Sequence, residues 1–285
     1  MMLLTLKFAI AALVFATGLS ATREDLFWIW RKPGLLGRSF LAMYVLVPLV
    51  AIVMTLAFDL PRPTKIGLLF LSISAGAPLL PRKLIKLGGD PAYVFSLVVA
   101  TSLAAILTVP GSLFLLQPLL PVEADIDIGR VAATILKTFL LPLAVGMAVR
   151  AFAIEWAERL GDPLMRVGGV LLTLGALVFI VSSWSHIVEI GLPSLLAFAS
   201  FTGMALAVGH WLGGPDEGQR SSLAVACATR HIGLALLIAA NVKGPKTLAL
   251  VAAYLFASAL VCIPYIRWRR RVMNRQTPSP QPSPM

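Results

Sequence analysis

The chain has 285 residues, of which 58% are hydrophobic and 13% are charged, and its formal net charge is +11. A soluble globular domain carries about 45–50% apolar and about 25% charged residues, so this apolar excess cannot all lie inside one globular core. The composition therefore excludes an ordinary soluble domain. Basic residues cluster in short loops beside apolar blocks, which indicates a membrane protein and not a nucleic-acid-binding protein.

Nine apolar blocks follow one another along the chain, each close to the roughly 20 residues that a helix needs to cross a bilayer. Backbone groups in lipid must be bonded within their own segment, which favours helices, and the short alternating segments of a barrel are not seen. The sequence thus predicts an all-α polytopic membrane protein with nine transmembrane helices. They are expected near residues 3–21, 38–58, 66–88, 92–119, 131–152, 167–184, 192–212, 221–241 and 247–266. We expect residues 269–285, basic and then rich in proline and serine, to form a disordered tail.

The distribution of lysine and arginine favours one orientation of these helices. With the N-terminus outside, sixteen of the 24 basic residues lie on the inner side and only five on the outer side. The positive-inside rule therefore predicts an external N-terminus and a cytoplasmic C-terminus, in the cell (inner) membrane. The block after Lys7 also has the pattern of a signal peptide, and its cleavage would leave eight helices.

Two spans carry features that interrupt a helix. In the third, Pro78 and a second proline precede Arg82 and Lys83, and proline removes a backbone donor and clashes with the previous turn. The eighth has Arg230 and His231 near its middle, where an ionisable residue usually faces a cavity or a partner. Interrupted helices at matching places in two halves are typical of inverted-repeat transporters with two crossed discontinuous helices. A structural kink, a structural ion pair or a misplaced span boundary are the alternatives.

The segments around these residues resemble the bile acid:sodium symporter family. The likeness lies in LSISAGAP from Leu71, in KLGGDPAYVFSLVVATSLAAILTVP up to Pro110, and in SLAVACATRHIGLALLIAA at 222–240. This resemblance needs the first helix and implies one transporter unit over residues 1–268. It also implies a core with the two broken helices at its centre and a smaller panel. The core would hold the helices about 38–119 and 192–266, and the panel those about 3–21 and 131–184.

The resemblance implies sodium sites, but most of their ligands are missing here. The family's hydroxyl pair on the fourth span aligns with Leu97 and Thr101, which leaves Thr101 as a residual sodium ligand. The glutamate that both sodium ions share aligns with Ala226, and Lys83 replaces a further polar ligand. A hard cation needs several oxygen ligands, so this pattern argues against sodium coupling. The Thr101 hydroxyl would otherwise bond to a carbonyl one turn back. We expect no metal and no other cofactor.

Positive groups at the crossing favour an anionic substrate, preferably a carboxylate, because half-helix N-termini add positive dipoles there. The candidate substrate-binding or coupling residues are Arg230, His231, Lys83, Arg82 and Pro78. The leading hypothesis is a secondary active transporter of small organic anions. A proton-coupled or facilitative carrier of the same fold is the alternative, and a receptor or a membrane enzyme is the third. No HExxH or GxSxG motif is present, so we expect no enzyme. The expected partners are the lipid bilayer and a small anion, not nucleic acid, and the oligomeric state stays open.

The charge pattern yields a topology prediction. A cysteine placed in the 22–37 loop should not react with an impermeant thiol reagent outside intact cells, whereas one placed in the 59–65 loop should react. The measurement is labelling before and after permeabilisation. Labelling of the 22–37 loop in intact cells would contradict the predicted orientation.

Overall fold

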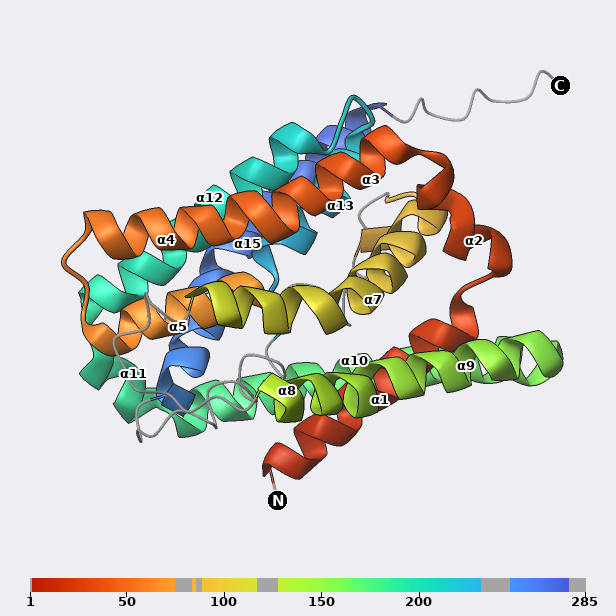
Figure 1. Cartoon of the computed structure of the whole chain (residues 1–285), viewed down its shortest axis with the longest axis horizontal. Helices are drawn as coiled ribbons and strands as arrows, with labels where there is room; N and C mark the ends of the chain where they lie inside the picture. Colours follow the sequence, from red (N-terminus) through yellow and green to blue (C-terminus); the bar gives the residue numbers. More distant parts are fainter. Residues whose placement is uncertain (1, 75–83, 86–88, 117–127, 232–246, 277–285) are drawn as a thin grey trace, which may run out of the picture.

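The computed structural model describes residues 2–74, 84–85, 89–116, 128–231 and 247–276, and all regular structure in these ranges is helical (Figure 1). Among the described helices, five are long and apolar enough to cross a membrane, so the total of nine spans stays a prediction. The α-helices are α1 (Met2–Ser20), α2 (Arg23–Trp28), α3 (Pro33–Phe40), α4 (Val47–Ala57), α5 (Arg62–Ile73), α7 (Pro91–Leu116), α8 (Ile128–Ile135), α9 (Leu141–Phe152), α10 (Ile154–Ser182), α11 (Trp184–Ile190), α12 (Leu192–Leu212), α13 (Glu217–Ala228) and α15 (Thr247–Gln276).

Two of these helices continue into their neighbours through π-helical turns. The turn η2 (Leu41–Leu46) joins α3 to α4, and η4 (Leu136–Leu140) joins α8 to α9. Such turns widen a helix locally and occur frequently at functional sites. The short helix α2 was not expected from hydropathy. It begins at a capping box, in which the Thr22 hydroxyl accepts from the Asp25 N–H and the Asp25 carboxylate accepts from the Thr22 N–H.

The helix boundaries differ from the hydropathy prediction in three places. Helix α10 corresponds to the sixth expected span, but it begins at Ile154 and not near residue 167. Its first turns carry charged residues, and they also bury Ala157 and Gly161 against the rest of the protein. Helix α5 ends at Ile73, inside the third expected span, and helix α13 ends at Ala228, inside the eighth. Both ends fall inside blocks that are mainly apolar on either side of the end, so hydropathy alone could not locate them.

The prediction of a disordered tail from residue 269 is wrong for residues 269–276, which continue helix α15. Arg269 is buried, and its Nε donates to the Ser221 hydroxyl at 2.7 Å. Its Nη2 donates to the Glu217 carboxylate and to the Glu217 carbonyl. The Arg269 guanidinium holds the pKa of the Glu217 carboxyl below its ordinary value. These contacts order the basic helix end, and residues 277–285 lie outside the described residues.

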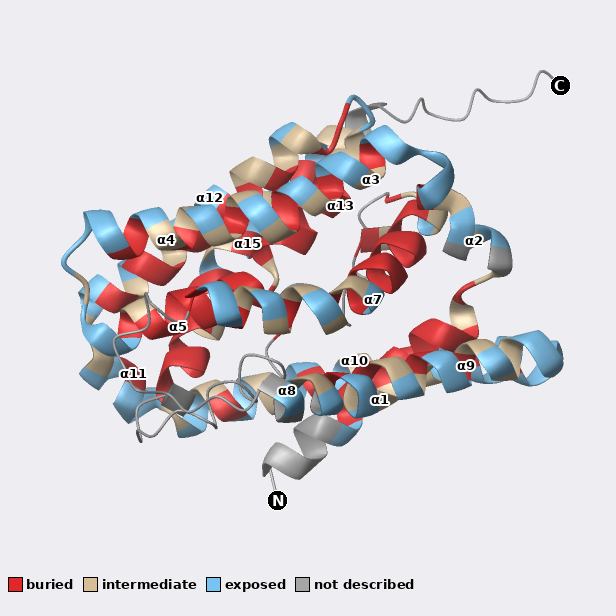
Figure 2. Cartoon of the chain, viewed as in Figure 1, coloured by how far each residue is buried: buried red, intermediate tan, exposed pale blue. Residues whose placement is uncertain are grey.

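The buried apolar side chains form two clusters. Figure 2 marks all buried residues of the described chain in red. The larger cluster comes mainly from α3, η2, α4, α5, α7, α12, α13 and α15. The smaller one joins α1, α9 and α10, the helices that the resemblance assigns to a panel, with Phe139 of η4. Phe95 and Val99 of α7 belong to this smaller cluster, so α7 links the two groups of helices.

Helices α1 and α9 cross with their backbones in close contact. A Cβ atom at Gly18 would lie 2.4 Å from the Leu143 carbonyl oxygen, and one at Gly146 would lie 2.3 Å from the Phe15 carbonyl oxygen. Small residues at such crossings are typical of membrane helices, which gain packing energy from close approach. Near this crossing, Arg150 of α9 donates from Nη1 to the Leu19 carbonyl at 2.9 Å. It satisfies a carbonyl at the end of α1.

This crossing predicts that Gly146→Ala destabilises the protein by about 1–3 kcal/mol, because the added methyl group meets backbone and not a flexible side chain. The matched control is Gly203→Ala in α12, where a Cβ would meet nothing within 4 Å. Alanine favours a helix over glycine, so the control should not destabilise. Thermal unfolding of the purified protein in detergent measures both. Equal unfolding midpoints for the two variants would contradict the close crossing.

Candidate functional site

The ends of helices α5 and α13 meet in the larger cluster. Helix α5 ends at Ile73 and helix α13 at Ala228, and the backbone after each end leaves the helical region. The His231 N–H donates to the Ser74 carbonyl oxygen at 2.7 Å, which joins the two ends directly. Non-helical backbone within a membrane protein is tolerated where the protein itself satisfies the peptide groups.

The sequence explains why the Ser74 carbonyl is free to accept this bond. In a continuing α-helix its donor would be the N–H of the residue four positions later. That residue is Pro78, which has no N–H. The backbone N–H of His231 therefore takes the place that Pro78 cannot fill. The end of α13 has no such local cause, since no proline or glycine occurs between Glu217 and His231 apart from Gly218 in the first turn.

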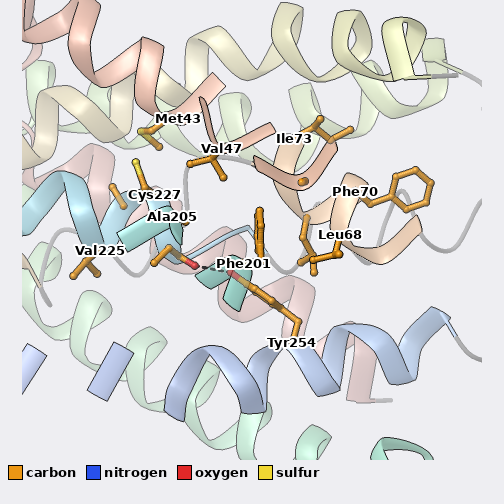
Figure 3. Packing of buried hydrophobic residues seen from close by; sticks show 14 of the residues in the cluster. Met43, Val47, Leu68, Phe70, Ile73, Phe201, Ala205, Val225, Cys227 and Tyr254 are labelled. Atoms are coloured by element: carbon orange, nitrogen blue, oxygen red, sulfur yellow. Dashed lines mark hydrogen bonds between the residues drawn. The ribbon is translucent and has the colours of Figure 1, made fainter. Parts of the chain in front are cut away.

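Tyr254 of α15 holds the end of α13. Its side chain is fully buried, and its hydroxyl donates to the Ala228 carbonyl at 2.6 Å, drawn as a dashed line in Figure 3. The same hydroxyl accepts from the Arg230 N–H at 3.3 Å. The last carbonyls of a helix have no donor within the helix, so a buried end needs a partner of this kind. One phenol thus satisfies two backbone groups at the interruption.

Arg230 lies immediately after this end and is only 1% exposed. Its Nη1 donates to the Met43 carbonyl oxygen at 3.5 Å, and Met43 lies in the π-helical turn η2. None of the ion pairs among the described residues includes Arg230. The arginine therefore places a positive charge inside the larger cluster, next to the meeting point of α5 and α13.

His231 connects this point to the smaller cluster. Its ring lies against Phe139 of η4, with ring centroids 4.1 Å apart and an interplanar angle of 81°. The His231 side chain is 2% exposed and Phe139 is 8% exposed. The two rings bring a helix of the expected panel against the interrupted part of the expected core.

Thr101 makes the structural contact that the sequence left as the alternative to sodium binding. Its hydroxyl donates to the Leu97 carbonyl at 2.8 Å and to the Val98 carbonyl at 3.1 Å. Its own carbonyl accepts from the Tyr44 hydroxyl at 2.8 Å. At the two other aligned sodium positions on described helices, Leu97 and Ala226 are buried and offer no side-chain oxygen. Within the described ranges, no group of three or more His, Cys, Asp or Glu residues could hold a metal ion.

The structure places only part of the predicted site. Arg230 and His231 lie together at the helix interruption, whereas Thr101 lies on α7 and is tied to its own helix. Pro78, Arg82 and Lys83 lie outside the described residues, so their part in the site stays a prediction.

The hydropathy pattern missed Tyr254, Met43 and Phe139, although they contact the site. A signal existed for Tyr254, because a tyrosine hydroxyl buried in the middle of an apolar helix usually has a hydrogen-bond partner. The Met43 carbonyl is a backbone atom and leaves no trace in the residue type.

The comparisons with known proteins agree with the family resemblance seen in the sequence. The model of the sodium bile acid symporter family matches residues 7–189, which ends before α12 and α13. The chain is 25% identical over 272 residues to "Probable sodium/metabolite cotransporter BASS2, chloroplastic" of Oryza sativa subsp. japonica, covering 91% of this chain and 62% of that protein. It is 27% identical over 254 residues to "Probable sodium/metabolite cotransporter BASS6, chloroplastic" of Arabidopsis thaliana, covering 78% and 59%. It is 26% identical over 207 residues to the BASS3 protein of Arabidopsis thaliana, covering 71% and 47%. The chain thus spans about half to three fifths of the length of these relatives.

The contacts of Tyr254 yield a prediction. Tyr254→Phe should destabilise the protein by about 1–3 kcal/mol, because it leaves the buried Ala228 carbonyl and the Arg230 N–H without a partner. Tyr265→Phe is the matched control on the same helix. Among the described residues its hydroxyl bonds to the half-buried His210 ring alone, at 2.9 Å, so the loss should be smaller. Chemical denaturation of the detergent-solubilised protein measures both, and a neutral Tyr254→Phe would contradict the role of the phenol.

Proposed function

Because the chain belongs to the sodium bile acid symporter family, we propose that it is a secondary transporter that moves small organic anions across a membrane. Its substrate site is the meeting point of α5 and α13. Transport by this route requires no enzyme chemistry and no cofactor beyond a coupling ion. The names of the relatives, which are cotransporters of sodium and a metabolite, support transport as the class of activity.

One observation carries the choice of an anion. The guanidinium of Arg230 is buried where two helices are interrupted, and no carboxylate among the described residues pairs with it. A buried charge is costly unless a partner or a ligand compensates it, and ionisable residues inside membranes usually mark substrate or ion pathways. An anionic substrate would supply the missing charge.

The coupling that we propose does not require two sodium ions. Ala226 and Leu97 cannot ligate a cation through their side chains, and the Thr101 hydroxyl already bonds within α7. A sodium ion relying on Thr101 and backbone oxygens would recover its hydration energy poorly. The Arg230 guanidinium is instead a permanent cation at the crossing. Transport would then be facilitated, or coupled to protons through the imidazole of His231.

We place the protein in the cell (inner) membrane with its N-terminus outside and its C-terminus in the cytoplasm, on the strength of the charge distribution. A receptor or a membrane enzyme is the second candidate class. Neither needs two interrupted helices whose ends are joined by a bond such as that between His231 and Ser74, so transport is favoured.

The test is uptake of a panel of labelled organic anions into proteoliposomes. We expect wild-type uptake to persist in sodium-free buffer, and Arg230→Gln to reduce it to background. The matched control is Arg166→Gln, which removes the same charge from an exposed arginine on α10 that pairs with Asp162 at 3.8 Å. This control should transport like the wild type.

Two results would contradict the proposal. Uptake that vanishes without sodium and returns cooperatively as sodium is added would show that sodium coupling survives the loss of ligands. Equal uptake by wild type and Arg230→Gln would show that Arg230 does not belong to the substrate site. A proton gradient imposed in the absence of sodium separates proton-coupled transport from facilitated transport.

A further inference from the structure

The guanidinium of Arg230 has two edges with different surroundings. Nη1, on the same side as Cδ, donates to the Met43 carbonyl oxygen. The opposite edge consists of Nε–H and one N–H of Nη2, which point in the same direction. In the part of the chain that the structure describes, neither Nε nor Nη2 has a hydrogen-bond partner, although both atoms are buried. The open edge is therefore the one that presents two parallel donors.

A comparison with Arg269 shows that this open edge is unusual. Both arginines are almost completely buried, at 1% and 2% exposure. In Arg269 the same two atoms have partners: Nε donates to the Ser221 hydroxyl, and Nη2 donates to the Glu217 carbonyl and carboxylate. Arg230 has one long bond to a carbonyl and no anionic partner among the described residues. Two unbonded donors of a buried cation cost free energy that a bound anion would recover.

The neighbours of Arg230 hold its side chain without neutralising it. Tyr254 fixes its backbone through the N–H, and Met43 fixes one end of the guanidinium plane. Both contacts come from helices outside α13, so the plane is oriented by the tertiary structure. The hydroxyls of Tyr44 and Tyr254 lie close enough to interact with the charge, and a phenol is neutral near pH 7.

We propose that the Nε–Nη2 edge of Arg230 binds a carboxylate of the transported anion side-on, through two parallel N–H···O bonds. This inference rests on the proposed function and names the chemical group that its site recognises. The two oxygens of a planar carboxylate match the spacing and the plane of the two donors, which lysine cannot reproduce. The single negative charge of the carboxylate balances the single positive charge of Arg230.

The test uses the purified full chain in detergent at constant ionic strength, with thermal unfolding followed against probe concentration. The probes are acetate, butyrate and benzoate, and for each a sulfonate of the same hydrocarbon group and the corresponding amide. A ligand that binds only the folded state raises the unfolding midpoint in a saturable manner. We expect at least one carboxylate to do so, and its sulfonate and amide partners to bind about 10-fold more weakly or not at all. Absence of a shift with every carboxylate, or equal affinity for carboxylate and sulfonate, overturns the proposal.

Variants test the edge itself. Arg230→Lys keeps the charge and loses the paired donors, so the affinity for the carboxylate should fall about 10- to 100-fold. Arg166→Gln on α10 is the control and should bind like the wild type. Unchanged affinity in Arg230→Lys overturns side-on binding. If the Arg230 variants do not fold, the ranking of the probes on the wild-type protein decides the question alone.

The binding assay in detergent tests the carboxylate site, and the uptake assay in proteoliposomes tests transport. Either assay can give a negative result without the other. Carboxylate binding with the expected ranking, together with no uptake of any anion, would contradict the proposed transport and still support the carboxylate site. Uptake that depends on Arg230 but is limited to sulfonates or phosphates would support transport and contradict the carboxylate site.

Discussion

The structure depends on one constraint, that backbone N–H and C=O groups at an interrupted helix must be satisfied inside the protein when water is excluded. Pro78 has no N–H to serve as the donor that the Ser74 carbonyl would have in a continuous helix, and the His231 N–H donates to this carbonyl instead. At the other end, the Tyr254 hydroxyl satisfies the Ala228 carbonyl. The path of the chain through residues 229–231 follows from these bonds.

This path decides where the charge of Arg230 lies. Arg230 lies in the short segment between the end of α13 and the bond from His231 to Ser74, and its side chain is 1% exposed. The same segment sets His231 against Phe139 of the neighbouring group of helices. Helix α7 links the two groups, because its Phe95 and Val99 belong to the smaller cluster. A structural solution for backbone bonding thus also creates a buried cationic site beside the boundary of two helix groups.

The sequence singled out Arg230 and His231 because ionisable groups inside an apolar block are rare and expensive, and their role in a substrate site stays a prediction. It also identified the family, which the match over residues 7–189 confirms. It could not find the partners of Arg230. The Met43 carbonyl belongs to the backbone, and Tyr254 looks like any other aromatic residue of an apolar helix. For Thr101 the sequence left two interpretations open, a residual sodium ligand and a hydroxyl bonded to a carbonyl one turn back. The structure contains the bond from the Thr101 hydroxyl to the Leu97 carbonyl.

The sequence by itself determined that the chain is helical and lies in a membrane, because long apolar blocks and basic loops are properties of composition and spacing. Only the tertiary structure decided that α5 ends at Ile73 and α13 at Ala228, and that α15 continues to Gln276. Lipid and protein interior are both apolar, so hydropathy cannot show where a helix stops inside an apolar block. The bonds that fix these ends join residues far apart in the sequence, such as Ser74 with His231 and Glu217 with Arg269, and they exist only once the helices have packed.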